Sequence, residues 1–436
     1  MSMQDDPSRT PTMVRRRVLA MTVALAGLTY LDRVCISHAG VTASIKEELG
    51  ISDKQMGLVY SAFTLAYALF ELPTGAWGDR VGTRRVLTRI VAWWSTFTIA
   101  TAAAFSYRSM LAIRFLFGAG EAGAFPNVAR TLSRWFPTAE RGAAQGVFFA
   151  GAHLGGGLTP MLVSALLVVL PWRGIFVVFG AIGFAWAWAW YAWFRDEPSQ
   201  HPSVGREERE YIEAGRSPVA PHRLDLAALK TIAADRSLLG LCLMYFTQAY
   251  GFYFNLTWMP TYLARDRGLS ADRIGAMAAV LAGLPLILSA VADVAGGITS
   301  DRLVKAYGLR TGRCGLGGLS LVVAGLAMIA GATAPDALAA ALLIALSGAA
   351  ASFLLGACWS VCQDVAGPHA GLVAACMNTS GQVGAFISPI LLPHFADPAV
   401  PLCIAGALYL LGAASWLLVD PTRPIGAGVH EGGETN

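Results

Sequence analysis

The sequence predicts an all-α membrane protein of twelve transmembrane helices, arranged as two pseudo-symmetric bundles of six. The chain of 436 residues is 55% hydrophobic and only 14% charged, with a mean hydropathy of +0.53. Ordinary soluble domains carry about 25% charged residues. Apolar stretches of spanning length recur from end to end, and one long polar connection separates two groups of six. These observations favour a polytopic helical membrane protein over a large soluble core.

The expected spans follow from the apolar stretches. Residues 195–235, rich in charge and proline, form the polar connection. We therefore expect an N-terminal six-helix bundle over 1–194, a central loop over 195–235 and a C-terminal six-helix bundle over 236–436. The predicted spans are 17–40, 56–77, 86–105, 110–132, 141–168, 173–194, 238–263, 272–299, 312–333, 337–362, 370–394 and 399–419.

The distribution of lysine and arginine predicts the orientation. If the N-terminus is cytoplasmic, 23 basic residues fall on that side of the membrane and 7 on the other. This bias places both termini and the central loop inside, in the cytoplasmic (inner) membrane. The apolar run after Arg17 continues well beyond the length of a signal peptide, so we expect an uncleaved first span. Of the 32 basic residues, only Arg33 and Arg114 must lie within the membrane.

Composition also excludes several functional classes. Basic residues outside the spans lie in short loops, which excludes a nucleic-acid partner. The seven cysteines lie almost all in apolar segments and form no C-x-x-C pair, so no metal site or disulfide framework is expected. Metal-binding His/Cys sets, Gly-x-Ser-x-Gly and phosphate-cradling loops do not occur, which argues against an enzyme with a cofactor. The expected surroundings are a lipid bilayer and a small-molecule ligand, and we expect a monomer.

The stretch 112–137 combines an apolar helix with two charges. Arg114 and Glu121 are separated by close to two helical turns, so both project from one face at a distance of roughly 10 Å. Small residues around them, including Gly118 and Gly120, let a ligand or another backbone come close. This pattern indicates a polar cavity inside a membrane protein.

The two halves of the chain are related in sequence. The pattern Gly-x-x-x-Asp-Arg occurs at 75–80, after the second span, and again at 297–302, after the eighth. A glycine and a proline with the same spacing occur at 155 and 160 in the fifth span, and again at 384 and 389 in the eleventh. Duplicated six-helix units that meet around a central site are a transporter architecture.

The whole chain resembles the major facilitator superfamily, and within it the anion:cation symporter family. The superfamily resemblance rests on the loop signature at 75–85, GAWGDRVGTRR. The family resemblance rests on YLDRVCIS at 30–37, RFLFGAGEAGAFP at 114–126, DEP at 196–198 followed by HP at 201–202, and WMPTYL at 258–263. The resemblance implies the major facilitator fold and organic-anion transport. Four residues depart from the family pattern, and the last three of them have no assigned role: Cys35, His38, Glu71 and Asp293.

Four charged residues in the spans are the strongest site candidates: Asp32, Arg33, Arg114 and Glu121. Each costs about 3 kcal/mol at the centre of a span, so they must pair, face water or bind a ligand. An ion-pair network that only braces the helices is the alternative. Arg33 and Arg114 should lie at similar depth, which suits a shared carboxylate. The resemblance implies anion binding by these arginines and proton carriage by Asp32 and Glu121.

Further candidates line the expected cavity or its ends. Substrate contacts are expected from Tyr67, His153, Gln248, Asn255, Asn378 and Gln382, with helix packing as the alternative for each. His153 aligns with Gln382 through the repeat that relates the fifth span to the eleventh, although a helix-packing role is favoured for it. Gating of the inner face is expected from Asp79, Arg80, Arg84, Asp301 and Arg302.

The sequence therefore predicts proton-coupled symport of a small organic anion by alternating access. A sugar acid or another hydroxylated carboxylate is the expected substrate, with protons as the co-substrate. An organic-anion exchanger or efflux carrier of the same fold is the alternative within this class. A membrane enzyme and a non-transporting sensor are the alternatives from other classes.

Overall fold

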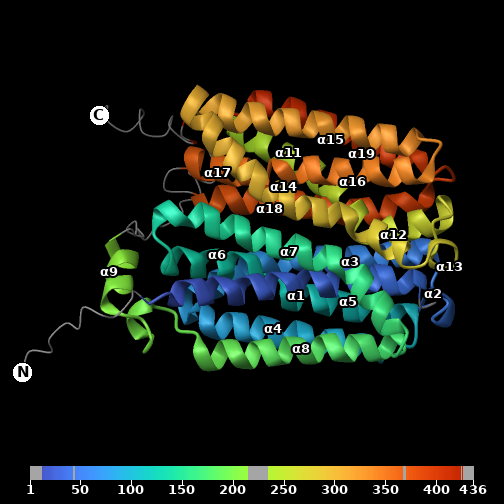
Figure 1. Cartoon of the computed structure of the whole chain (residues 1–436), viewed down its shortest axis with the longest axis horizontal. Helices are drawn as coiled ribbons and strands as arrows, with labels where there is room; N and C mark the ends of the chain where they lie inside the picture. Colours follow the sequence, from blue (N-terminus) through green and yellow to red (C-terminus); the bar gives the residue numbers. More distant parts are fainter. Residues whose placement is uncertain (1–11, 43–44, 215–233, 367–369, 424, 426–436) are drawn as a thin grey trace, which may run out of the picture.

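The computed structural model describes residues 12–42, 45–214, 234–366, 370–423 and 425. In these residues the regular secondary structure is helical, and no strand is present. The long helices lie side by side along the long axis of the molecule (Figure 1). The all-α prediction is therefore confirmed, and each of the twelve predicted spans coincides with one helix or with consecutive helices.

The first six spans form the N-terminal half. A short helix, α2 (Ile45–Glu48), connects the first span to the second. The spans are α1 (Val14–Thr42), α3 (Asp53–Val81), α4 (Thr83–Thr101), α5 and α6 (Tyr107–Glu121 and Ala124–Trp135), α7 (Thr138–Leu167) and α8 (Trp172–Trp193).

The last six spans form the C-terminal half, after a linker that contains α9 (Arg206–Ala214). The seventh and eighth spans of the chain are joined by α13 (Ala271–Ile274). The spans are α11 (Arg236–Thr257) with α12 (Met259–Thr261), α14 (Ala276–Leu309), α15 (Leu316–Thr333), α16 and α17 (Ala337–Phe353 and Leu355–Ala366), α18 (Ala370–Leu391) and α19 (Ala399–Ser415).

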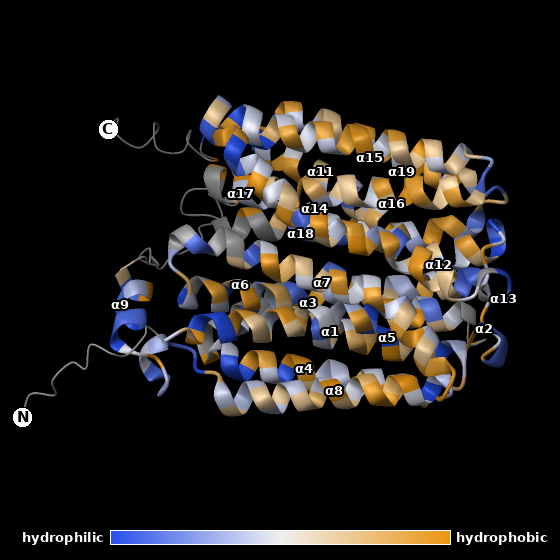
Figure 2. Ribbon diagram, viewed as in Figure 1, coloured by the Kyte–Doolittle hydropathy of each residue, from blue (hydrophilic) through white to orange (hydrophobic). Residues whose placement is uncertain are grey.

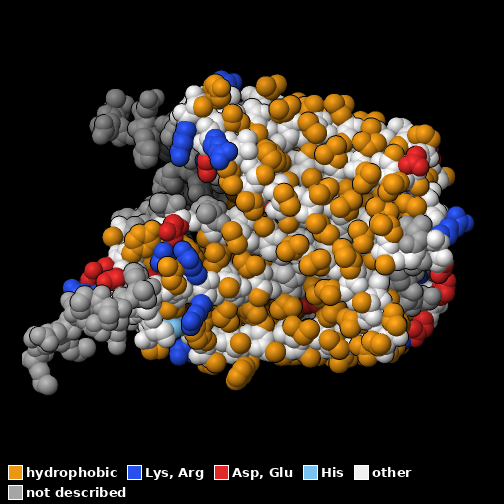
Figure 3. All heavy atoms as spheres, viewed as in Figure 1, with side chains coloured by type: hydrophobic (Ala, Val, Ile, Leu, Met, Phe, Trp, Pro, Cys, Tyr) orange, Lys and Arg blue, Asp and Glu red, His pale blue; other side chains and the backbone are white. Residues whose placement is uncertain are grey.

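The two ends of the bundle differ in what they carry. The termini end is where α1 begins and where α9 lies, whereas the distal end carries α2 and α13 (Figure 1). Figure 2 shows apolar residues along the helices between the two ends. In the face drawn in Figure 3, hydrophobic side chains cover the middle and most charged side chains gather at the ends. This distribution matches a protein that crosses a bilayer.

The fourth span differs from the unbroken helix expected over 110–132. Helix α5 ends at Glu121 and α6 begins at Ala124. Gly123 has a φ of 84°, in the left-handed region that a glycine adopts without steric cost. The break places Glu121 at the last residue of α5, where its side chain is buried. A β-carbon on Gly118 would overlap the backbone of Phe63, so α5 also crosses α3 very closely.

The two halves touch at the distal end. A β-carbon on Gly57 of α3 would overlap the carbonyl oxygen of Pro389 on α18. The hydroxyl of Ser61 donates to the carbonyl of Phe386 on α18 at 2.7 Å. We call this set of contacts, together with the ion pairs described next, the distal gate. In this structure the distal gate is closed.

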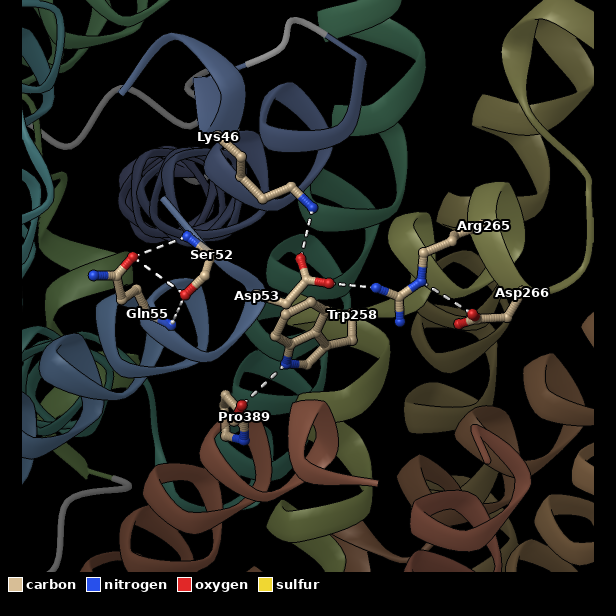
Figure 4. A network of polar contacts seen from close by, with 8 residues as sticks. All are labelled: Lys46, Ser52, Asp53, Gln55, Trp258, Arg265, Asp266 and Pro389. Atoms are coloured by element: carbon tan, nitrogen blue, oxygen red, sulfur yellow. Dashed lines mark hydrogen bonds and ion pairs between the residues drawn. The ribbon is translucent and has the colours of Figure 1, made fainter. Parts of the chain in front are cut away.

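The distal gate also includes a network of ion pairs and hydrogen bonds between polar side chains (Figure 4). Asp53, at the start of α3, accepts from Lys46 at 3.0 Å and forms an ion pair with Arg265 of the opposite half. Arg265 also pairs with Asp266 at 3.1 Å. Burial alone would raise the pKa of Asp53, but Lys46 and Arg265 outweigh it and hold this pKa below its usual value. Asp53 therefore stays ionised at neutral and mildly acidic pH.

The linker between the halves caps the first span. Glu208 of α9 is buried and accepts from the backbone N–H groups of Val14 and Arg15, each at 3.0 Å. The Thr12 hydroxyl donates to the same carboxylate at 2.7 Å. A carboxylate at a helix N-terminus satisfies free N–H groups and matches the positive end of the helix dipole. This contact fixes the beginning of α1 relative to the linker.

Candidate functional site

A buried ion pair joins α1 to α5. The Arg33 Nε donates to Glu121 Oε1 at 2.7 Å, and its Nη2 forms a second bond to the same oxygen. Arg33 is 8% exposed and Glu121 is fully buried. The sequence leaves open whether Glu121 pairs with Arg114 along its own helix or with Arg33 across the cavity. In this structure the partner is Arg33.

Aromatic rings surround the Arg33 guanidinium. Such faces attract cations, with the largest effect where water is excluded. Phe63 and Tyr67 are one helical turn apart on α3, so their rings lie on one face of that helix. Tyr67 was a sequence candidate, whereas Phe63 and Phe125 were not. The ring centroids lie at these distances from the Arg33 Cζ: Phe63 4.8 Å, Tyr30 5.2 Å, Tyr67 5.2 Å and Phe125 5.7 Å.

Arg114 lies beside the same aromatic cluster. Its Cζ is 4.4 Å from the ring centroid of Phe117 and 5.5 Å from that of Phe63. Arg114 is 3% exposed, and its Nε has no hydrogen-bond partner among the described residues. Arg33 also packs on Phe63, so both guanidinium groups contact one ring. The structure thus brings together the two arginines that the sequence places inside the membrane.

The side chains of Asp32 and Arg33 point to different helices, as the rotation of about 100° between adjacent helical residues predicts. The Thr98 hydroxyl of α4 donates to Asp32 Oδ2 at 3.4 Å. Asp32 Oδ1, Glu121 Oε2 and the Tyr253 hydroxyl are buried and have no hydrogen-bond partner in the described part of the chain.

Buried polar atoms are normally paired, so these unpaired atoms mark a place for a ligand or water. Tyr253 lies on α11, in the half opposite to the arginines. The sequence analysis missed this residue, although it lies between the candidates Gln248 and Asn255 on the same helix. The site therefore involves both halves of the molecule.

The other candidates from α11 face their own half. The Gln248 amide donates to the carbonyl of Ala351 at 3.4 Å. Asn255 lies against α16, where a β-carbon on Gly348 would be 3.1 Å from its Nδ2. Both amide atoms of Asn255, and Oε1 of Gln382, have no hydrogen-bond partner among the residues described.

Two side-chain contacts cross between the halves near the site. His153 Nδ1 of α7 lies 2.5 Å from Asp293 Oδ2 of α14. The Asn378 amide of α18 donates to Glu71 Oε1 of α3 at 2.6 Å. The ring of His153 also contacts Tyr30, with ring centroids 5.5 Å apart. Neither pairing follows from the sequence analysis, which leaves Glu71 and Asp293 without a role.

The expected gating residues lie at the termini end. The Arg84 Nε donates to the carbonyl of Tyr191 at 2.8 Å, and Arg302 is exposed. Asp301 accepts from Arg313 of its own half at 2.9 Å. The side chains of Asp79 and Arg80 lie outside the described part of the structure, so their gating role stays a prediction.

His38 lies near the distal end of α1. Its Nε2 is 2.8 Å from the hydroxyl of Ser164. The ring borders a cavity of about 710 Å³ that α7 and α14 also line. No group of three or more His, Cys, Asp or Glu residues that could hold a metal ion occurs in the described ranges.

Comparisons with known proteins identify the family. Residues 22–389 match the model of the Major Facilitator Superfamily. The chain is 32% identical to a Cupriavidus necator protein named "Probable sulfoacetate transporter SauU", with 96% of this chain and 97% of that protein covered. It is 32% identical to the hexuronate transporter of Bacillus subtilis, with 92% and 93% covered. It is 30% identical to the D-galactonate transporter of Escherichia coli O6:H1, with 97% and 100% covered.

The solved structures agree on the fold. A bacterial homologue of the human lysosomal transporter Spinster, crystallised in an inward-facing and unoccupied conformation, superposes with a TM-score of 0.71. The two chains are 19% identical, and the superposition covers 94% of this chain and 98% of that one. This chain is a multi-pass membrane transport protein and not an enzyme. It belongs to the major facilitator superfamily and, within it, to the anion permeases.

Proposed function

We propose that this protein is a symporter that carries a small organic anion together with protons by alternating access. Sugar acids and other small hydroxylated or acidic carboxylates are the substrate class. The observation that carries the proposal is the pair of buried arginines beside one aromatic ring, one of which is held by Glu121.

The arginines provide the anion site. A guanidinium can bind a carboxylate or sulfonate with paired, charge-assisted hydrogen bonds. Arg114 Nε has no hydrogen-bond partner among the described residues, which leaves a donor for an incoming anion. The names of the relatives given above refer to sulfoacetate, hexuronate and D-galactonate, which are all organic anions.

The charge balance of the interior supports proton coupling. Four buried carboxyl groups, those of Asp32, Glu71, Glu121 and Asp293, share the interior with the guanidinium groups of Arg33 and Arg114. Ionisation of all four carboxyl groups would leave the site negative, and each uncompensated charge costs about 3 kcal/mol in a membrane. An incoming anion increases this deficit, so its binding requires protons on carboxyl groups.

Glu121 is the proposed coupling group. Its carboxylate occupies the Nε and Nη2 donors of Arg33 that an anionic substrate would use. Protonation of Glu121 weakens this pair and frees Arg33, so the proton and the substrate bind together. Asp32, held by Thr98 and beside the same cluster, is the second proposed proton carrier.

The orientation follows from the basic residues. The loops at the termini end carry most of the arginines, which supports a cytoplasmic location for this end and an inner membrane as the site of the protein. The distal gate is then the external gate. Its closure in this structure corresponds to a state that is sealed from outside.

A panel of acids tests the anion proposal. Purified protein is heated with D-galactonate, D-glucuronate, D-glucarate, sulfoacetate or neutral D-galactose, and the melting temperature is recorded. At least one of the acids should raise the melting temperature, because binding to the folded state stabilises it. Stabilisation by galactose, with none by the acids, would rule out an anion site.

A further inference from the structure

Two carboxyl groups on equivalent helices form the two side-chain contacts near the site that cross between the halves. The offset in sequence that relates Asp79 to Asp301, in the two Gly-x-x-x-Asp-Arg patterns, also relates Glu71 to Asp293. Their partners, Asn378 and His153, come from α18 and α7, the helices that carry the repeated glycine and proline. The two carboxyl groups are therefore related by the internal repeat, whereas their partners lie one helical turn out of register, because His153 aligns with Gln382 and not with Asn378.

The two contacts differ in one chemical respect. The Glu71 contact is made with an amide N–H, which keeps its hydrogen at every physiological pH. The contact between His153 Nδ1 and Asp293 Oδ2, at 2.5 Å, needs a hydrogen between two titratable atoms. That hydrogen belongs either to the imidazole or to the carboxyl group. A neutral imidazole with its hydrogen on Nδ1 supplies this bond without an added proton, but it leaves a buried carboxylate with no compensating charge. An imidazolium beside a carboxylate, or a neutral imidazole beside a carboxylic acid, gives a pair without net charge that holds one proton more than the separated groups.

The burial of the pair favours the form without net charge, which holds the additional proton. Both side chains are at most 4% exposed, and Asp293 Oδ1 has no hydrogen-bond partner among the described residues. The titratable groups that face Asp293 from neighbouring helices are Tyr30 of α1 and Cys358 of α17, which are both neutral donors in their ordinary state. Arg33 lies against the ring of Tyr30, with its Cζ 5.2 Å from the ring centroid, and is paired with Glu121. His153 is therefore the group that neutralises Asp293.

The pair lies next to the closest crossing of the two halves. Gly157, one helical turn from His153, packs against the backbones of Gly283 and Ile287 on α14. A carrier that opens its distal end must separate α7 from α14 at this crossing. A contact of 2.5 Å one turn away does not survive such a separation.

We infer that His153 and Asp293 form a second proton-binding site, which holds one proton while the distal gate is closed and releases it to water when the gate opens. On separation the imidazole or the carboxyl group gives the proton to the water that enters, and leaves a neutral imidazole and a carboxylate. This inference rests on the alternating access in the proposed function. The site ties one proton to the conformation of the carrier, independently of the proton on Glu121.

A Gly57→Trp variant provides the opened state without any substrate. The indole cannot fit against the Pro389 carbonyl, so the distal gate cannot close. Opening is verified by alkylation of Cys35, which is fully buried behind the closed gate. Purified protein, with and without Gly57→Trp, is brought to the same neutral pH, and the bound protons are counted by back-titration.

The pair is isolated by repeating the count in a His153→Gln/Asp293→Asn background. We expect Gly57→Trp to release about one proton more in the native background than in this one. The matched control measures the proton release caused by Gly57→Trp in a Glu71→Gln background. This release should equal that of the native background, because Glu71→Gln changes the symmetry-related carboxyl group and leaves His153 in place. An equal release with and without the pair would overturn the inference.

Nuclear magnetic resonance of the ¹⁵N-histidine-labelled protein gives a second readout that needs no variant at the pair. A strongly hydrogen-bonded imidazole N–H signal, assigned to His153 by its loss in His153→Gln, should be present with the gate closed and lost in Gly57→Trp. Persistence of that signal in Gly57→Trp would also overturn the inference. Both experiments omit substrate, so their failure leaves anion symport through Arg33 and Glu121 standing.

Discussion

Replacement of Glu121 by glutamine is the perturbation that best separates substrate binding from proton coupling. Glutamine has nearly the same shape as a protonated glutamate and carries no charge. In Glu121→Gln the Arg33 guanidinium loses its carboxylate partner but keeps the aromatic rings around it. The variant therefore represents a carrier that is permanently protonated at this position.

The size of the effect follows from the contact that is lost. A hydrogen bond to a charged group contributes about 1.5–3 kcal/mol to stability. Two Arg33 donors meet one Glu121 oxygen in a fully buried site, so at least one such contribution must be given up before an anion can bind. A difference of about 1.4 kcal/mol in binding free energy corresponds to a tenfold change in affinity. At alkaline pH, Glu121→Gln should bind its anion about 10- to 100-fold more tightly than the parent.

Reconstituted vesicles provide the matching transport assay. Glu121→Gln should still exchange labelled for unlabelled substrate across the membrane, because exchange needs no net proton movement. It should not accumulate substrate when an inward proton gradient is imposed, since glutamine cannot release a proton inside. Accumulation equal to that of the parent would show that Glu121 is not an obligatory proton carrier. In that case Asp32 or the His153–Asp293 pair would be the next candidate.

Four further variants test other parts of the structure. Arg33→Ala and Arg114→Ala should each abolish the acid-induced rise in melting temperature while the apo protein stays folded, and an unchanged rise would remove that arginine from the site. Asp53→Asn should open the distal gate and speed alkylation of Cys35. Thiols react as thiolates, so labelling of the parent is compared at each pH with that of Gly57→Trp, in which the gate stays open. Because the pKa of Asp53 lies below its usual value, its ion pairs should hold the gate closed down to pH 5; a parent rate that rises toward the Gly57→Trp rate as the pH falls to 5 would contradict the assignment. Glu208→Gln should lower the melting temperature at neutral pH by weakening the cap on α1, at a cost of about 1–3 kcal/mol, and an unchanged value would mean that the cap contributes no stability.

The sequence predicts the spans well because each one must be apolar over a fixed length. It is less informative where local backbone geometry decides. The break at Gly123 lies in a run of small residues that reads as continuous helix, and the left-handed glycine is visible only in the structure. This break determines where Glu121 ends α5, and it therefore shapes the site.

The charged cluster was also predictable, because unpaired charges in a span are costly. The charges alone could not decide the partner of Glu121, since Arg114 lies on the same helix face and Arg33 lies on another helix whose position relative to α5 the sequence does not give. In the structure the side chain of Arg33 reaches from α1 to the end of α5 and bonds Glu121, which settles this choice in favour of Arg33.

The contacts between the halves could not be predicted, although their residues stand out in the sequence. Glu71 and Asp293 are visible as charges in apolar helices, and one offset relates them. Their partners depend on how α7 packs against α14 and how α3 packs against α18. The first contact joins residues that are 140 positions apart in the sequence, and the second joins residues that are 307 positions apart. A single sequence carries no direct record of such long-range pairs.

Proton-driven accumulation by the unmodified carrier is the measurement that tests the central claim most directly. Vesicles containing the purified protein are loaded with a pH indicator and mixed with the labelled acid that gives the largest melting shift. The membrane potential is clamped at zero, and an inward proton gradient is imposed. We expect the acid to accumulate above its external concentration while the vesicle interior acidifies with it. Equal uptake with and without the gradient, and no acidification linked to the acid, would contradict proton-coupled symport.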